Sequence, residues 1–157
     1  MLFALPMLLG NVFQQLYIFV DSIVVGNFLG KGALTAVGAS FPVFFALISL
    51  GIGLATGAGV VISQYFGAKQ YDNVQKAIDT MYIILIASAV IIGVVGITFI
   101  DDILALVKLP EGTTASAKIY LTILLGGLIF DFGYNGTAAI FRSLGDSKTP
   151  LYFLIVA

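Results

Sequence analysis

Polar side chains recur along one side of the helix expected for residues 2–28, the first apolar stretch of the chain. At about 100° per residue they fall within an arc of roughly 160°, and apolar side chains fill the rest of the circle. Such a face is costly against lipid, so we expect it to look into the protein interior or a water-filled cavity. The polar set is Asn11, Gln14, Gln15, Tyr17, Asp21 and Ser22, and the apolar set is Phe13, Leu16, Phe19, Val20 and Ile23.

Asp21 is the carboxylate on this polar face. A carboxylate that loses its hydration favours the neutral form unless a cation or several hydrogen-bond donors compensate. Asp21 can therefore exchange a proton or hold Na⁺, with Asn11, Gln14 and Tyr17 as supporting polar groups. The alternative is a structural aspartate near the helix end that reaches interfacial water or pairs with a basic residue. Ionisable residues inside a membrane are usually functional, which favours cation coupling.

Asp131 and the neighbouring Asn135 form a second candidate site, in the middle of the apolar stretch 114–143. An acid this deep in a crossing can act as a second proton site. It can also be a structural group that binds a hydroxyl or lysine of a neighbouring helix. The sequence leaves both interpretations open.

The residue types in the chain exclude several other kinds of chemistry. The chain has no cysteine and no histidine, which excludes disulfides, thiolate chemistry and the usual transition-metal ligands. Without clustered acids as well, we predict no catalytic residues and no enzyme. The net charge is −1, the pI is near 5.0, and the basic residues never cluster, so nucleic acid is not an expected partner. No cofactor is expected beyond H⁺ or Na⁺ as a coupling ion, and no metal apart from Na⁺ at Asp21.

The composition determines the elements that must position these groups. Of 157 residues, 60% are hydrophobic and 10% charged, which is too much apolar surface for a soluble domain of this size. No charged residue lies between Lys31 and Lys69 or between Asp79 and Asp101, and each gap holds the roughly 20 residues of a membrane-spanning helix. The stretch 81–100 does not alternate in polarity as a barrel strand would. We therefore predict an all-α polytopic membrane protein.

Four transmembrane helices and the start of a fifth are expected, as a fragment of a longer membrane protein. Glycines around Lys31 predict a turn at 30–32, and a polar connection is expected over 64–75. Asp101 and Asp102 can cap a short interfacial helix, and the second crossing is long enough to bend near Pro42. The expected crossings are residues 2–28, 33–63, 74–100 and 114–143, with an incomplete helix at 150–157.

Loop charges give the orientation, since cytoplasmic loops carry an excess of Lys and Arg. Four basic residues fall on one side and three on the other, which weakly favours a cytoplasmic N-terminus. The first side holds Lys69, Lys76, Arg142 and Lys148, and the second holds Lys31, Lys108 and Lys118.

Small residues and prolines predict how these helices pack and bend. Gly51, Gly53, Ala55, Gly57 and Gly59 space small side chains four apart in two adjoining rows, which favours close helix packing over substrate contact. Pro6 removes a helical hydrogen bond in the first crossing and is a candidate hinge, although most membrane prolines are static kinks.

Four stretches together resemble the multidrug and toxic compound extrusion (MATE) family, in the family's order and spacing. The resemblance covers the whole chain, and any one stretch would be weak alone. The first runs from Leu5 to Tyr17 and continues at Val20-Asp21-Ser22; the others are Ala36 to Pro42, Ser63 to Lys69 and Arg142 to Pro150.

This resemblance implies twelve helices in two six-helix lobes around a central cavity, with access alternating as H⁺ or Na⁺ exchanges. Asp21 matches the family's coupling aspartate, and Pro6 matches the proline proposed to let the first helix bend. The family's partner residues on the fifth helix would follow Ala157. Asp131 matches no motif of the family.

The function implied is a secondary antiporter that exports organic cations or drugs in exchange for H⁺ or Na⁺. Its partners would be a small amphiphilic substrate, membrane lipid and the remaining helices, in a bacterial or archaeal inner membrane. One alternative is a lipid-linked precursor flippase of the wider superfamily, which would need a strongly basic cavity. Another is a non-transporting membrane scaffold, against which the polar face of the first helix argues.

Overall fold

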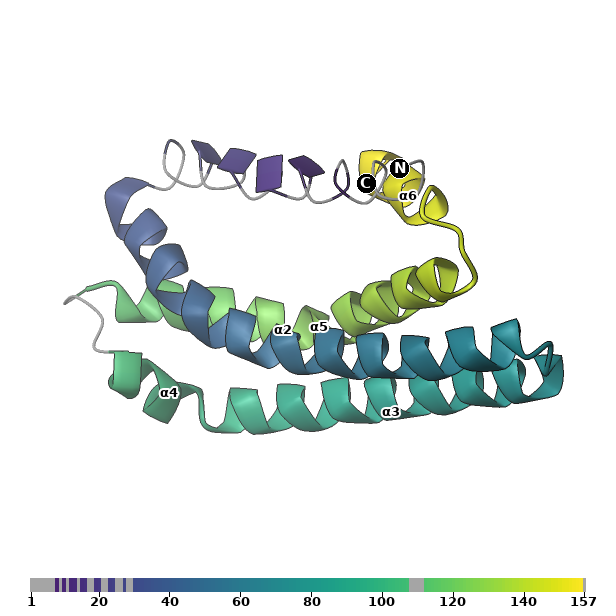
Figure 1. Cartoon of the computed structure of the whole chain (residues 1–157). Coiled ribbons are helices and arrows are strands. Elements are labelled where there is room, and N and C mark those ends of the chain that lie inside the picture. Colours follow the sequence, from purple (N-terminus) through teal and green to yellow (C-terminus); the bar gives the residue numbers. More distant parts are fainter. Residues whose placement is uncertain are drawn as a thin grey trace.

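The computed structural model describes residues 30–107 and 112–156, together with eleven residues of the N-terminal segment. All of these N-terminal residues are helical: Leu8, Gly10, Val12, Phe13, Gln15, Leu16, Phe19, Val20, Ile23, Val24 and Asn27. The remaining helices are α2 (Gly30–Gly67), α3 (Tyr71–Thr98), α4 (Ile100–Val107), α5 (Thr114–Ser143) and α6 (Thr149–Val156) (Figure 1).

Three of these helices are long and apolar enough to cross a membrane, namely Ser40–Gly67, Tyr71–Thr98 and Thr114–Ser143. Each has 28 to 30 residues, or roughly 42 to 45 Å at 1.5 Å per residue, which exceeds the hydrocarbon thickness. The prediction of an all-α membrane protein is therefore confirmed. The count of four crossings and the six-helix lobe remain predictions.

The boundaries of α2 differ from those expected. The turn predicted at residues 30–32 is wrong, because these residues form the first turn of α2. Two glycines cost a helix roughly 1 kcal/mol each relative to alanine, yet a helix still satisfies their backbone hydrogen bonds internally. α2 also continues through Gly67 and ends where Lys69 adopts a left-handed φ of 58°. Residues 64–67, which were expected in the polar connection, thus extend the helix, since hydropathy reports the environment of a helix and not its end.

α3 and α4 follow each other with a single residue between them. α3 starts at Tyr71 and ends at Thr98, and α4 starts at Ile100. Asp101 and Asp102 consequently lie inside the first turn of α4 and not before it, where the partial positive charge of the helix start favours carboxylates. Asp101 also accepts two hydrogen bonds from the Lys118 ammonium of α5, at 2.6 and 2.7 Å.

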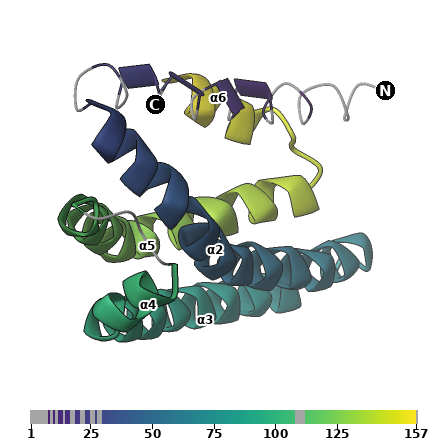
Figure 2. The same cartoon turned by 90° about the vertical axis from the view of Figure 1, so that its left-hand side faces the viewer.

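α2, α3 and α5 pack together into one apolar core, with α6 and the described N-terminal residues on the other side of α5 from α3 (Figure 2). A Cβ built on Gly51 would lie 2.5 Å from Cε1 of the buried Phe132 ring. A Cβ on Gly59 would lie 2.8 Å from the Ser143 hydroxyl, whereas one on Gly53 meets nothing within 4 Å. Only the row 51, 55, 59 therefore packs against α5, and its small residues allow the backbones to approach.

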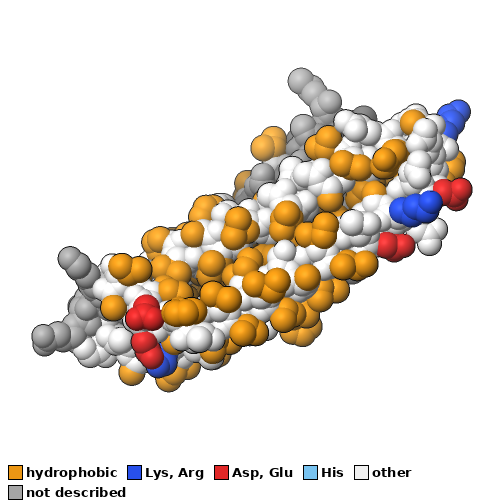
Figure 3. All heavy atoms as spheres, turned by 90° about the horizontal axis from the view of Figure 1, so that it is seen from below, with side chains coloured by type: hydrophobic (Ala, Val, Ile, Leu, Met, Phe, Trp, Pro, Cys, Tyr) orange, Lys and Arg blue, Asp and Glu red, His pale blue; other side chains and the backbone are white. Residues whose placement is uncertain are grey.

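On the face shown in Figure 3, charged side chains gather at the two ends of the described bundle and hydrophobic side chains cover the middle. Among described side chains, Lys69 and Lys76 belong to the end where α2 meets α3, and Lys118 belongs to the opposite end near α4. This separation is the one that a membrane-spanning bundle requires, because charges are expensive in hydrocarbon. The cytoplasmic placement of the N-terminus remains a prediction.

Asp146 organises the turn that leads into α6. Its carboxylate accepts hydrogen bonds from the Thr149 hydroxyl and from the backbone N–H groups of Lys148 and Thr149. These bonds, with the Thr149 hydroxyl bond as the largest contribution, hold the pKa of Asp146 below its ordinary value of 3.8. The start of α6 therefore depends on the ionised form of this side chain.

Because the pKa of Asp146 is lower in the folded state, its hydrogen bonds stabilise this turn fully at pH values above the ordinary pKa of 3.8. This stabilisation is lost as the pH falls from 3.8 through the folded-state pKa. We expect the protection of the Lys148 and Thr149 amides against hydrogen exchange to decrease as the pH is lowered from about 4 to the folded-state pKa of Asp146. Protection is the exchange rate compared with the intrinsic rate of an unfolded chain at the same pH. Asp146→Asn keeps an oxygen that can accept both amide bonds but does not titrate. An unchanged pH profile in that variant would contradict the assignment.

Candidate functional site

Most members of the predicted site on the first helix lie outside the described residues: Pro6, Asn11, Gln14, Tyr17 and Asp21. The described part of the same helix shows its apolar face. Phe13, Leu16, Phe19, Val20 and Ile23 are all exposed, with Phe19 at 64%. Gln15 of the polar set is also exposed, so it sits at the margin of the polar arc.

The first helix lies close to α6 at one described point. A Cβ on Gly10 would lie 3.9 Å from Cδ1 of Leu151, which is ordinary van der Waals contact. Both views show α6 and the described N-terminal residues on the same side of the bundle (Figures 1 and 2). This proximity places the first helix beside the element expected to continue the site.

The two residues of the second predicted site, Asp131 and Asn135, form a hydrogen-bonded pair. Asn135 Nδ2 donates to the Asp131 carbonyl at 2.9 Å and to Asp131 Oδ2 at 3.2 Å. Both side chains are half-buried, and one helical turn separates them on α5. The Asn135 amide thus fixes one carboxylate oxygen of Asp131 and leaves the other available to a proton or cation.

Helix geometry places this pair on the side of α5 away from α3. Gly136 faces α3, since a Cβ there would lie 2.6 Å from Cδ1 of Leu85. Asp131 precedes Gly136 by five residues and so points roughly 140° away from it. That side of α5 faces the region of α6 and the first helix (Figure 2). Asp131 therefore lies on the side of the bundle that holds α6 and the described N-terminal residues.

A polar contact that the sequence did not single out joins α3 to α5. The oxygens of Tyr82 and Thr137 lie 2.9 Å apart, and the Thr137 hydroxyl donates to the Gly133 carbonyl at 2.8 Å. Since Thr137 has one proton, Tyr82 donates to Thr137. This pair fixes the rotation of α5 and thereby the direction of Asp131. The sequence feature that could have predicted this contact is a tyrosine within an otherwise apolar helix.

A small cavity of about 260 Å³ also separates α2 from α5, with hydroxyl groups of Thr56, Ser63 and Ser143 in its wall and Arg142 at its edge. The Ser63 and Ser143 hydroxyls donate to carbonyls of their own helices, at 2.8 and 2.7 Å. These bonds occupy the only protons of both serine hydroxyls, whereas the Arg142 guanidinium carries five N–H donors. Within the described ranges, no three acidic side chains converge on a common point that a metal could occupy.

Comparison with known proteins gives one consistent result. The family model described as MatE matches residues 6–157. The chain is 38% identical to the probable multidrug resistance protein YoeA of Bacillus subtilis, over 99% of the chain and 34% of that protein. It is 30% identical to the multidrug export protein MepA of Staphylococcus aureus, over 78% of the chain and 27% of that protein.

Solved structures agree with the sequence matches. An outward-facing multidrug resistance MATE family transporter of the MOP superfamily superposes with a TM-score of 0.87 at 27% identity, covering 98% of the chain and 33% of the transporter. A MOP superfamily transporter from Pyrococcus furiosus gives a TM-score of 0.90 at 27% identity, covering 98% of the chain and 34% of that transporter. The chain thus spans about a third of the length of the proteins that it resembles.

Proposed function

Because the chain belongs to the MatE family, we propose that it forms part of a secondary antiporter that exports organic cations or drugs in exchange for H⁺ or Na⁺. The observation that carries this proposal is the match over residues 6–157, together with relatives named as multidrug resistance and export proteins. The chain is part of a multi-pass membrane protein with helices long enough to span the bilayer.

Asp21 is proposed as the cation-coupling residue, supported by Asn11, Gln14 and Tyr17 on the same face of the first helix. A coupling ion drives transport only if it binds one conformation better than the other. Neutralising Asp21 with H⁺ or Na⁺ would supply that difference, because a charged and a neutral carboxylate have different costs of burial. Pro6 is the proposed hinge, since its helix lacks one backbone hydrogen bond there.

Asp131, with Asn135, is proposed as a second proton site. Its half-buried position and its hydrogen bond from the Asn135 amide support this role. Asn135 can hold the carboxylate in one orientation in both protonation states, because a carboxyl oxygen accepts a bond in either state. Proton binding at Asp131 would then change charge without changing the local fold.

Dye efflux from proteoliposomes that contain the full-length protein tests the proposed function. We expect efflux of an amphiphilic cationic dye when a proton or sodium gradient is imposed, and its collapse when a protonophore or a sodium ionophore dissipates that gradient. Which ionophore abolishes transport identifies the coupling ion. Gradient-independent leakage equal to that of empty vesicles would contradict the exporter and favour a scaffold.

The polarity of the helix interiors separates the exporter from a lipid-linked precursor flippase. Among the described side chains, Lys69, Lys118, Arg142 and Lys148 lie near helix ends or in turns, and Lys76 lies in the second turn of α3. The cores of α2, α3 and α5 carry apolar and small residues. An anionic precursor would need basic groups deeper in the cavity. Flipping of a lipid-linked anionic precursor by the full-length protein, without cationic dye export, would favour the alternative.

A further inference from the structure

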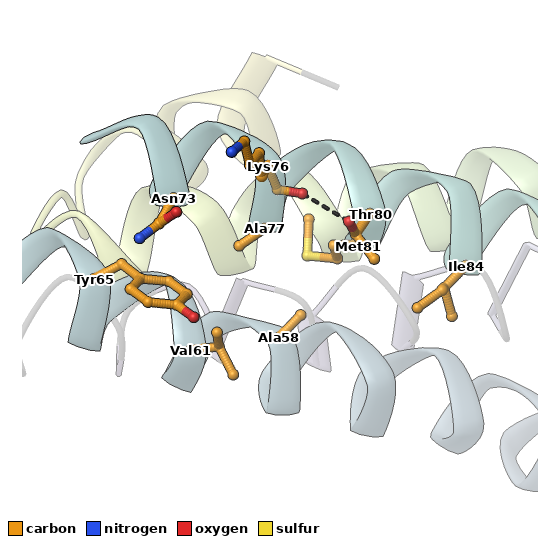
Figure 4. A pocket seen from close by; sticks show the side chains of 9 residues that line it. All are labelled: Ala58, Val61, Tyr65, Asn73, Lys76, Ala77, Thr80, Met81 and Ile84. Atoms are coloured by element: carbon orange, nitrogen blue, oxygen red, sulfur yellow. Dashed lines mark hydrogen bonds between the residues drawn. The ribbon is translucent and has the colours of Figure 1, made fainter. Parts of the chain in front are cut away.

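A groove of about 380 Å³ runs between α2 and α3, near the turn that joins them. Its polar end is formed by Tyr65, Asn73 and Lys76, and its apolar wall includes Val61, Met81 and Ile84 (Figure 4). The groove is open to the outside of the described bundle on the face where Val61 is 42% and Ile84 45% exposed. It is separate from Asp131, which lies on the side of α5 away from α3.

Small side chains create this space. Ala58 of α2 and Ala77 of α3 line the groove, where longer side chains would fill it. The apolar part thus offers a channel between two transmembrane helices, with a width set by two methyl groups. Such a channel suits a flexible hydrocarbon chain, which can fill the space and make van der Waals contacts with both helices.

The polar end presents hydrogen-bond donors and one positive charge. The Thr80 hydroxyl is occupied, because it donates to the Lys76 carbonyl at 2.7 Å (Figure 4). Asn73 uses one amide proton on Gln70 Oε1 at 2.8 Å and keeps a second. The Lys76 ammonium forms no ion pair with any described residue. Asp72 and Asp79 are close to Lys76 in the sequence of α3, but neither lines the groove.

The polar end of the groove lies near the membrane boundary, and its apolar end lies deeper in the membrane. Lys76 lies in the second turn of α3, near the turn that joins it to α2, and Ile84 lies about two turns further into the apolar span. A phospholipid has the same order of chemistry, with a charged phosphate at the boundary and an acyl chain below it. Basic residues between transmembrane helices at this level recognise anionic headgroups.

We propose that the α2–α3 groove binds an anionic phospholipid, with its phosphate at Lys76 and Asn73 and one acyl chain along Val61, Met81 and Ile84. The single unpaired ammonium supplies the charge complementarity, and the alanine-lined channel supplies the fit for the chain. Bound lipid would tie α2 to α3 near the turn that joins them.

Native mass spectrometry of the full-length protein in detergent tests this site, with phosphatidylglycerol and phosphatidylcholine of identical acyl chains as probes. We expect a tight site for phosphatidylglycerol that Lys76→Gln weakens about five-fold and Lys76→Arg preserves. Lys148→Gln removes a charge outside the groove and should leave the affinity unchanged. Ala58→Leu, which fills the channel but keeps Lys76, should weaken binding of both lipids.

Three outcomes would overturn the proposal. Equal losses in Lys76→Gln and Lys148→Gln would indicate a diffuse charge effect, and full lipid binding in Ala58→Leu would exclude the channel. Inorganic phosphate that competes as well as the lipid would show that the acyl chain is not recognised. Circular dichroism of each variant establishes that the helices are intact, so that a loss of lipid reports on the site.

Discussion

Asp21→Asn in the full-length protein is expected to reduce gradient-driven efflux to the level of protein-free vesicles, while membrane insertion and melting temperature stay near those of the wild type. Asparagine has the size of aspartate but cannot carry the charge that H⁺ or Na⁺ would neutralise. The ion therefore loses its preference for one conformation, and a ligand without such a preference shifts no equilibrium. Initial rates of dye efflux, normalised to the amount of reconstituted protein, measure the effect.

Asp131→Asn is the matched control for this experiment. The same chemical change is made on α5, where the asparagine can still pair with Asn135. As a second proton site, Asp131 should lower the efflux rate or shift its pH dependence without abolishing transport. Wild-type efflux in Asp21→Asn would remove Asp21 from the mechanism, and complete loss only in Asp131→Asn would move the coupling site to α5.

Gly51→Ala is expected to destabilise the packing of α2 against α5 by about 1–3 kcal/mol, the usual cost of overpacking a core. The added methyl would lie 2.5 to 2.7 Å from three atoms of the Phe132 ring, which is 1% exposed. A rigid ring cannot retreat as the end of a flexible chain can, so the helices must separate. Thermal unfolding of the full-length protein in detergent, followed by circular dichroism, measures the change.

Gly53→Ala provides the control, because its added methyl would meet nothing within 4 Å. This variant should be neutral or more stable by up to about 1 kcal/mol, the difference in helix propensity between the two residues. Phe132→Leu should recover part of the stability lost in Gly51→Ala by making space for the methyl. Equal melting temperatures for the two alanine variants would contradict the packing of Gly51 on Phe132.

The fold class could be predicted because it depends on the hydrophobicity of each stretch of the chain taken by itself. Long stretches without charge must be helical in lipid, whatever their neighbours are, since no water is present to bond the backbone. The apolar face of the first helix was predicted in the same way, and Phe19 and Leu16 are exposed as expected. Helix ends were predicted less well, because glycines at 30 and 32 and the segment 64–67 are compatible with either a turn or a helix.

What the sequence by itself determined is therefore a helical membrane protein of the MatE family with a polar first helix and an acid in the 114–143 crossing. Only the tertiary structure decided that the row of Gly51 packs on Phe132 while Gly53 is free, and that Asp131 points away from α3. It also decided that Lys76 lies beside a groove between α2 and α3. Helical periodicity gives relative angles along one helix, but the rotation of that helix against its neighbours depends on contacts between residues far apart in the chain.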